Sequence, residues 1–127
     1  MPVHNALPHL DAAVESILRQ SFANFEFIIL DDASTDGSTE RLREWASKDS
    51  RIRLLEVTKN LGPALSSEYV ACAASTPIVA RMDADDVSYP ERIEEQAHSG
   101  SLPSATTTRT DRLTGRSSRD QVARPRA

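Results

Sequence analysis

Short apolar segments alternate with helical segments along the first 96 residues, and this alternation constrains the fold more than any other feature. The apolar segments of strand length are residues 25–30, 52–57 and 77–80, and residues 1–3 resemble the end of a further strand. The segments with helical character are residues 8–20, 38–48 and 63–75. This order predicts an α/β fold with a parallel sheet and right-handed crossovers.

The helix over residues 63–75 is expected to turn its larger apolar side chains toward the core. These side chains are Leu65, Tyr69, Cys72 and Ala73. Cys72 is the only cysteine, so the chain has no internal disulfide, and we expect this residue to be a small buried apolar side chain.

Carboxylates follow two of the predicted strands. Asp31 and Asp32 come directly after residues 25–30, and Asp83, Asp85 and Asp86 follow residues 77–80. Because ligands of α/β sheets bind beyond the carboxyl ends of the strands, we expect both groups at one edge of the sheet. Asp83 and Asp85 are two residues apart and leave an extended backbone on the same side. Such crowded carboxylates suit Mg2+ or Mn2+, although an isolated Asp-x-Asp also occurs as a polar loop with a helix cap.

The charge of the chain divides it into two parts. The 127 residues fit one small domain, and the net charge is -4. Residues 1–96 have 17 acidic and 9 basic side chains, whereas residues 97–127 have six arginines, two aspartates and ten Ser or Thr residues. We expect residues 97–127 to be a disordered basic tail that arose by a frameshift or a misassigned gene end. Basic tails sometimes bind nucleic acid or anionic membranes, but no specific nucleic-acid partner is expected.

No run of about eighteen apolar residues occurs, so the sequence predicts no membrane span. The N-terminus also lacks a charged region followed by an apolar core. We expect a cytoplasmic protein, with peripheral association to a membrane left open.

Residues 1 to about 96 resemble the family 2 glycosyltransferases. The resemblance rests on Met-Pro-Val-His-Asn (1–5), Ser-Ile-Leu-Arg-Gln-Ser-Phe (16–22), Phe-Glu-Phe-Ile-Ile-Leu-Asp-Asp-Ala-Ser-Thr-Asp-Gly-Ser (25–38), Asn-Leu-Gly (60–62) and Ala-Arg-Met-Asp-Ala-Asp-Asp-Val-Ser-Tyr-Pro-Glu-Arg (80–92). It implies a GT-A fold, a Rossmann-like three-layer α/β/α architecture with a parallel sheet, here incomplete. The division implied is a partial nucleotide-sugar-binding domain over residues 1–96 and a tail over 97–127.

The resemblance also implies which residues contact the nucleotide. Pro2 and His4 occupy the loop that meets the base, where a ring often stacks. Asp32 resembles the carboxylate that accepts a hydrogen bond from uracil, with Asp31 beside it. The donor implied is a nucleotide-diphospho-sugar in which the nucleotide is uridine diphosphate.

The acidic cluster has a second implied role. Asp83 resembles the residue near the ribose and the metal, and Asp85 the direct ligand of a divalent cation, Mn2+ or Mg2+, that bridges the diphosphate. Asp86 is expected to support the loop. The cation would neutralise charge that develops on the diphosphate as the sugar leaves.

The sequence departs from the family in the helix after Asn-Leu-Gly and at both ends. Where the family usually has Ala-Arg-Asn or Leu-Asn, this chain has Ser66-Ser67-Glu68, so an arginine that can contact the nucleotide is missing. The first strand is cut short, and no residue after 96 matches the acceptor half that supplies the catalytic base. We therefore expect a donor-binding half of an inverting glycosyltransferase, inactive alone, with the catalytic residues and acceptor unassigned.

Two other function classes share an α/β sheet with aspartates at strand ends. A metal-dependent nucleotidyltransferase usually has an early Gly-rich phosphate loop, and residues 1–20 contain no glycine. A non-catalytic signalling receiver domain requires a lysine after a late strand, and neither Lys48 nor Lys59 is well placed for that role.

Overall fold

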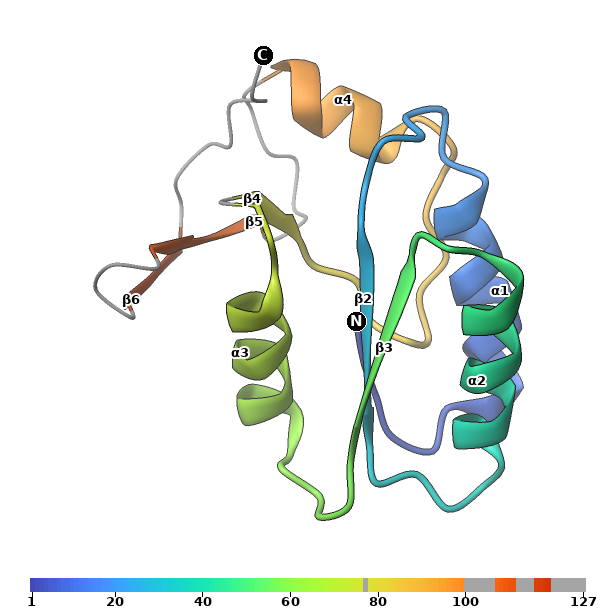
Figure 1. The fold of residues 1–127 in the computed structure, drawn as a ribbon. Helices are drawn as coiled ribbons and strands as arrows, with labels where there is room; N and C mark the ends of the chain where they lie inside the picture. Colours follow the sequence, from blue (N-terminus) through green and yellow to red (C-terminus); the bar gives the residue numbers. More distant parts are fainter. Residues whose placement is uncertain (77, 100–106, 112–115, 120–127) are drawn as a thin grey trace.

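A three-stranded parallel sheet with β2 at its centre organises the fold (Figure 1). The structure is a computed structural model that describes residues 1–76, 78–99, 107–111 and 116–119. The strands are β1 (Pro2–Val3), β2 (Phe27–Asp32) and β3 (Ile52–Val57), in the order β1-β2-β3. Strand β2 pairs with β3 along its whole length, from Phe27 opposite Ile52 to Asp32 opposite Val57.

Strand β2 is buried on both of its faces. All six of its residues are buried, and successive side chains point to opposite layers. Phe27 and Ile29 belong to one apolar cluster, and Ile28 and Leu30 belong to another. A nearly continuous apolar strand of this kind is typical of a parallel sheet that is covered by helices.

Helices cover the two faces of the sheet and make three layers. Helices α1 (Leu7–Leu18) and α2 (Ser38–Lys48) lie together on one side, and α3 (Pro63–Ala73) lies on the other (Figure 1). The expected three-layer α/β/α architecture is therefore confirmed. Helix α2 has the bounds that the sequence predicts, whereas α1 and α3 each end two residues earlier. None of the described helices is long and apolar enough to cross a membrane.

The predicted core face of α3 is wrong for its three larger residues, whereas the fourth, Ala73, does pack against the cluster that contains Ile28 and Leu30. Leu65 and Tyr69 are 57% and 49% exposed, and Cys72 is also exposed. The buried residues of the helix are Ser66 and Val70. Val70, together with Ala74 just after the helix, packs in one apolar cluster with Ile28 and Leu30 of β2. Hydrophobicity predicts that the larger residues are buried, whereas the face that packs on the sheet has smaller side chains.

The sequence predicts that residues 77–80 belong to the parallel sheet, and this is wrong: β4 (Ile78–Ala80) does not join that sheet. It pairs antiparallel with β5 (Thr107–Asp111), which pairs antiparallel with β6 (Arg116–Arg119). Strand β1 has only two residues, so it offers few backbone groups for another strand to pair with.

The predicted disordered tail is only partly within the described residues. Helix α4 (Arg92–Ser99) runs past the expected boundary at residue 96, and β5 and β6 follow it. Residues 100–106, 112–115 and 120–127 lie outside the described part of the chain. Both the domain boundary and the disorder of residues 97–127 stay predictions.

The α-amino group of Met1 is buried within the sheet region. It donates a hydrogen bond to the carbonyl oxygen of Ile28 at 2.8 Å. Burial lowers the pKa of this group from 8.0 to about 5, because the charged form loses its hydration, while the nearby Asp83 carboxylate acts in the opposite direction. The amine is therefore neutral in the folded chain at neutral pH.

This buried amine makes the stability of the 127-residue chain depend on pH. Between pH 5 and 8 the amine is protonated in the unfolded chain and neutral in the folded chain, so the unfolded state binds more protons. The free energy of unfolding should rise with pH across this window, by up to about 1.4 kcal/mol for each pH unit. Denaturant titrations at several pH values measure the slope. An N-terminally acetylated chain, which has no titratable amine, should lose this rise, and equal slopes in both chains would contradict the prediction.

Candidate functional site

The acidic loop, residues 81–86, follows β4 and is anchored by two buried side chains. Met82 and Ala84 are buried and belong to the apolar cluster that includes Met1 and Val3. Asp83, which lies between them, and Asp85 and Asp86, which follow them, are exposed. The loop is therefore fixed by its apolar members and presents its carboxylates to solvent.

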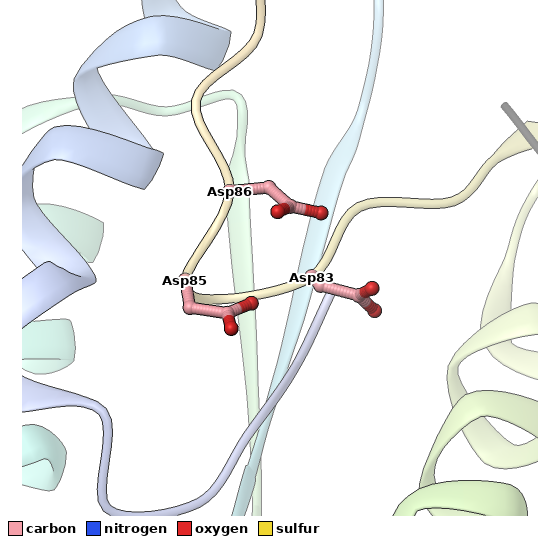
Figure 2. A group of neighbouring side chains, drawn as sticks. All are labelled: Asp83, Asp85 and Asp86. Carbon is pink, nitrogen blue, oxygen red and sulfur yellow. The ribbon is translucent and has the colours of Figure 1, made fainter.

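Three carboxylates gather on this loop. Asp83, Asp85 and Asp86 are exposed, and one oxygen from each lies within 4.8 Å of the others. Figure 2 shows the three side chains leaving the loop toward the same side. The backbone N–H of Asp86 donates to the carbonyl oxygen of Asp83 at 3.2 Å, which closes a turn around Asp85. Of the sequence-predicted residues, the structure thus brings these three together.

The charge and chemistry of this cluster fit a hard divalent cation. Three carboxylates at such short separations repel one another unless a positive charge lies among them. Arg81 forms an ion pair with one member of the cluster, its Nε lying 3.7 Å from Asp83 Oδ1. Carboxylate oxygens are the ligands that Mg2+ and Mn2+ prefer, with water and phosphate oxygens completing the coordination.

Arg92, at the start of α4, is hydrogen-bonded to the residues that flank the three carboxylates. Its guanidinium donates to the Arg81 carbonyl oxygen at 2.6 Å and to Ser88 Oγ at 2.8 Å, and lies 3.4 Å from Met82 Sδ. Burial lowers the pKa of Arg92, while Tyr89, Asp86 and Asp83 act against that shift. The guanidinium therefore lies partly desolvated next to the carboxylate cluster.

Asp31 and Asp32 lie at the end of β2, where both side chains are buried and already hydrogen-bonded. Asp31 accepts from the Ser34 backbone at 3.3 Å and from the Thr39 hydroxyl. Asp32 accepts from the backbone N–H groups of Leu61 at 2.7 Å and Gly62 at 3.1 Å. Two adjacent carboxylates thus hold two different loops, because successive side chains of a strand point to opposite faces.

His4 lies beside this end of β2. Its Nδ1 is 2.7 Å from the carbonyl oxygen of Asp32. Since a carbonyl only accepts, Nδ1 carries the proton, and Nε2 is left to accept from Asn60 Nδ2 at 3.3 Å. Pro2, in β1, lies opposite Leu30 of β2. His4, Asp32 and the loop at residues 60–62 therefore form one connected group.

The structure gives the two acidic groups separate hydrogen-bond partners. Among the described residues, no recorded hydrogen bond or ion pair joins Asp31 or Asp32 to the acidic loop. Met82 and Ala84 pack in the same apolar cluster as Met1 and Val3, so the acidic loop lies close to β1. Asn60, which contacts His4, and Arg92, which contacts the acidic loop, are residues for which the sequence predicts no site role. Their only signal was membership in the motif stretches 60–62 and 80–92.

Comparison with known proteins identifies the family. The family model described as glycosyl transferase family 2 matches residues 1–99. The chain is 39% identical to the putative glycosyltransferase EpsE of Bacillus subtilis (strain 168) over 97 residues, covering 76% of this chain and 35% of EpsE. It is 33% identical to the Escherichia coli UDP-Glc:alpha-D-GlcNAc-diphosphoundecaprenol beta-1,3-glucosyltransferase WfgD over 96 residues, covering 76% of this chain and 37% of WfgD.

A solved structure gives the same result. The mannosyltransferase PcManGT from Pyrobaculum calidifontis, in complex with GDP-Man and Mn2+, superposes with a TM-score of 0.65 at 28% identity, over 75% of this chain and 28% of that one. The chain spans little more than a third of the length of EpsE and of WfgD. The family model, the curated relatives and the fold agree, and the chain belongs to glycosyl transferase family 2.

Proposed function

We propose that this chain binds a nucleotide-diphospho-sugar through a divalent cation held by Asp85 and Asp83. The observation that supports this best is the cluster of three exposed carboxylates on the loop after β4, in a chain of this family. Asp85 is the direct ligand, Asp83 lies near the ribose and the cation, and Asp86 supports the turn. A bound cation would supply positive charge that offsets the charge of the diphosphate.

The base of the nucleotide is proposed to lie at the end of β2, near Pro2 and His4. The His4 ring is exposed and its orientation is fixed by the carbonyl oxygen of Asp32, which suits stacking on a flat base. A carboxylate offers about four lone-pair sites, so Asp32 can accept from a base N–H besides the two backbone donors it already has. Asp31 acts indirectly, by holding the loop that begins at Ser34.

The proposed donor is linked to uridine diphosphate. WfgD is named for a UDP-linked sugar, and PcManGT was solved with a GDP-linked one, so guanosine diphosphate is the appropriate competitor. The sugar and the acceptor stay open. We propose that these residues form the donor-binding part of a glycosyltransferase, since the family model matches residues 1–99 and the chain covers 35% of EpsE and 37% of WfgD. Family membership favours this function over a nucleotidyltransferase or a receiver domain.

Calorimetry with uridine diphosphate tests the proposal. Binding should be weak and should require Mn2+ or Mg2+, because the diphosphate and the acidic loop are both negative and repel at short range. Guanosine diphosphate, measured under the same conditions, should bind more weakly. Equal binding of uridine diphosphate in the presence of a chelator would rule out the metal-dependent site.

A further inference from the structure

We propose that Arg92 is a positioning residue for the acidic loop, and that Gln20 holds Arg92 in place. The inference rests on the proposed cation site and concerns residues outside it. Strand β4 is not hydrogen-bonded to the parallel sheet, so the sheet does not fix the acidic loop through backbone pairing. The buried side chains of Met82 and Ala84 anchor the loop, and the contacts of Arg92 add hydrogen bonds on both sides of its three carboxylates.

Arg92 contacts the backbone or side chains on both sides of the carboxylates. One nitrogen, Nη2, donates to the carbonyl oxygen of Arg81, which precedes Asp83. The other, Nη1, donates to Ser88 Oγ, which follows Asp86. A guanidinium presents several N–H groups in a fixed, planar arrangement and can therefore fix two chain segments at once. The segment that carries all three carboxylates lies between these two attachment points.

Gln20 connects this arrangement to the rigid part of the fold. Its buried amide uses both ends: Oε1 accepts from the backbone N–H of Ile93 at 3.0 Å, and Nε2 donates to the carbonyl oxygen of Tyr89 at 2.8 Å. The same Nε2 donates to the carbonyl oxygen of Ser16 in α1 at 3.0 Å. Nearby, Ser16 Oγ accepts from the backbone N–H of Ser88 at 3.0 Å.

The position of Arg92 follows from these contacts. Helix α1 packs in the core, Gln20 at its end fixes the first turn of α4, and Arg92 is the first residue of that turn. Outer contacts of this kind orient metal ligands in other proteins, and their loss typically lowers metal affinity by about 10–100-fold. The order of the acidic loop should thus depend on a side chain that touches no ligand.

The charge of Arg92 makes the proposal easy to test, because its two effects have opposite signs. A guanidinium close to a cation site repels the cation, so on charge alone its removal should strengthen binding. If Arg92 positions the loop, its removal should weaken binding. Arg81 is the matched control, since its side chain lies 3.7 Å from Asp83 but its own backbone carbonyl, which Arg92 uses, survives substitution.

The experiment measures Mn2+ binding to the 127-residue chain by electron paramagnetic resonance, without nucleotide. Arg92→Lys retains the charge but not the planar fork, and Arg92→Gln removes both. We expect each to weaken Mn2+ binding, by about 10-fold for Arg92→Gln and less for Arg92→Lys. Arg81→Gln should leave binding unchanged or slightly stronger. Circular dichroism confirms that each variant is folded, and Ser88→Ala, which removes one contact of the guanidinium, replaces any Arg92 variant that does not fold.

Amide hydrogen exchange of the metal-free chain gives a second readout. The N–H of Asp86 donates to Asp83 within the loop, and it should exchange faster in the Arg92 variants than in the parent chain or Arg81→Gln. Unchanged or stronger Mn2+ binding in the folded Arg92 and Ser88 variants would overturn the positioning role. If Asp85→Asn also leaves Mn2+ binding unchanged, the cation site itself is wrong, which separates failure of the proposed function from failure of this inference.

Discussion

Asp85→Asn is expected to reduce Mn2+-dependent binding of uridine diphosphate by more than about 100-fold. The substitution removes one ligand charge and leaves the loop geometry nearly unchanged, and a direct ligand should contribute more than outer residues, whose loss costs about 10–100-fold. Calorimetry with and without Mn2+ measures the effect. Asp83 and Asp86 remain within 4.8 Å of this position, so residual weak binding of the cation is expected.

Asp32→Ala provides the contrast, because Asp32 lies in the base region rather than on the acidic loop. It should weaken nucleotide binding while leaving the affinity for Mn2+ alone nearly unchanged. Asp32 also accepts from Leu61 and Gly62, so the variant should unfold more easily, by about 1–3 kcal/mol for the donors left unpaired. Titrations are therefore made well below the unfolding temperature. A loss of Mn2+ affinity in folded Asp32→Ala would contradict its role in contacting the base. Unchanged Mn2+ affinity in Asp85→Asn would contradict its role as the metal ligand.

Leu30→Ala should destabilise the fold by about 2–5 kcal/mol. Leu30 is 0% exposed, lies at the centre of the parallel sheet and packs in the cluster that α3 covers. A domain is stable by only about 5–15 kcal/mol, so this loss could unfold much of the population at room temperature. Urea titration followed by circular dichroism measures the change in the free energy of unfolding.

Leu65→Ala is the matched control for this prediction. The same substitution is made on a side chain that is 57% exposed on α3, and it should change stability by less than about 0.5 kcal/mol. A larger loss of unfolding free energy in Leu65→Ala than in Leu30→Ala would contradict the observed packing. It would favour the core face of α3 that the sequence predicts.

The central part of the fold was predictable because its signals are local. The apolar run at residues 25–30 and the helical periodicity of residues 8–20 each lie within one segment, and the alternation of such segments predicts a parallel sheet. The pairing of β4 was not predictable from its own residues. It depends on whether another strand, such as the two-residue β1, offers enough free backbone groups to pair with. The buried face of α3 depends on the shape of the sheet beneath it.

The site shows the same division. The three carboxylates were found from the sequence because they lie within four residues of one another. The hydrogen bond between Gln20 and Ile93 joins residues that are 73 positions apart, and no local sequence pattern predicts it. The backbone donors of Asp32 are 29 and 30 positions away, so the sequence did not indicate that this carboxylate holds the loop at residues 60–62.

The arrangement of charges around β2 also determines how this strand aligns with its neighbours. Its four apolar residues, 27–30, are bounded by Glu26 on one side and Asp31 on the other. A slip of one residue in either direction would move one of these carboxylates into a fully apolar layer, in place of Phe27 or Leu30, away from its own hydrogen-bond donors. Burial of an unpaired charge is costly enough to exclude both shifted alignments. The two carboxylates that bound the apolar run, Glu26 and Asp31, thus also discriminate against shifted alignments of the sheet.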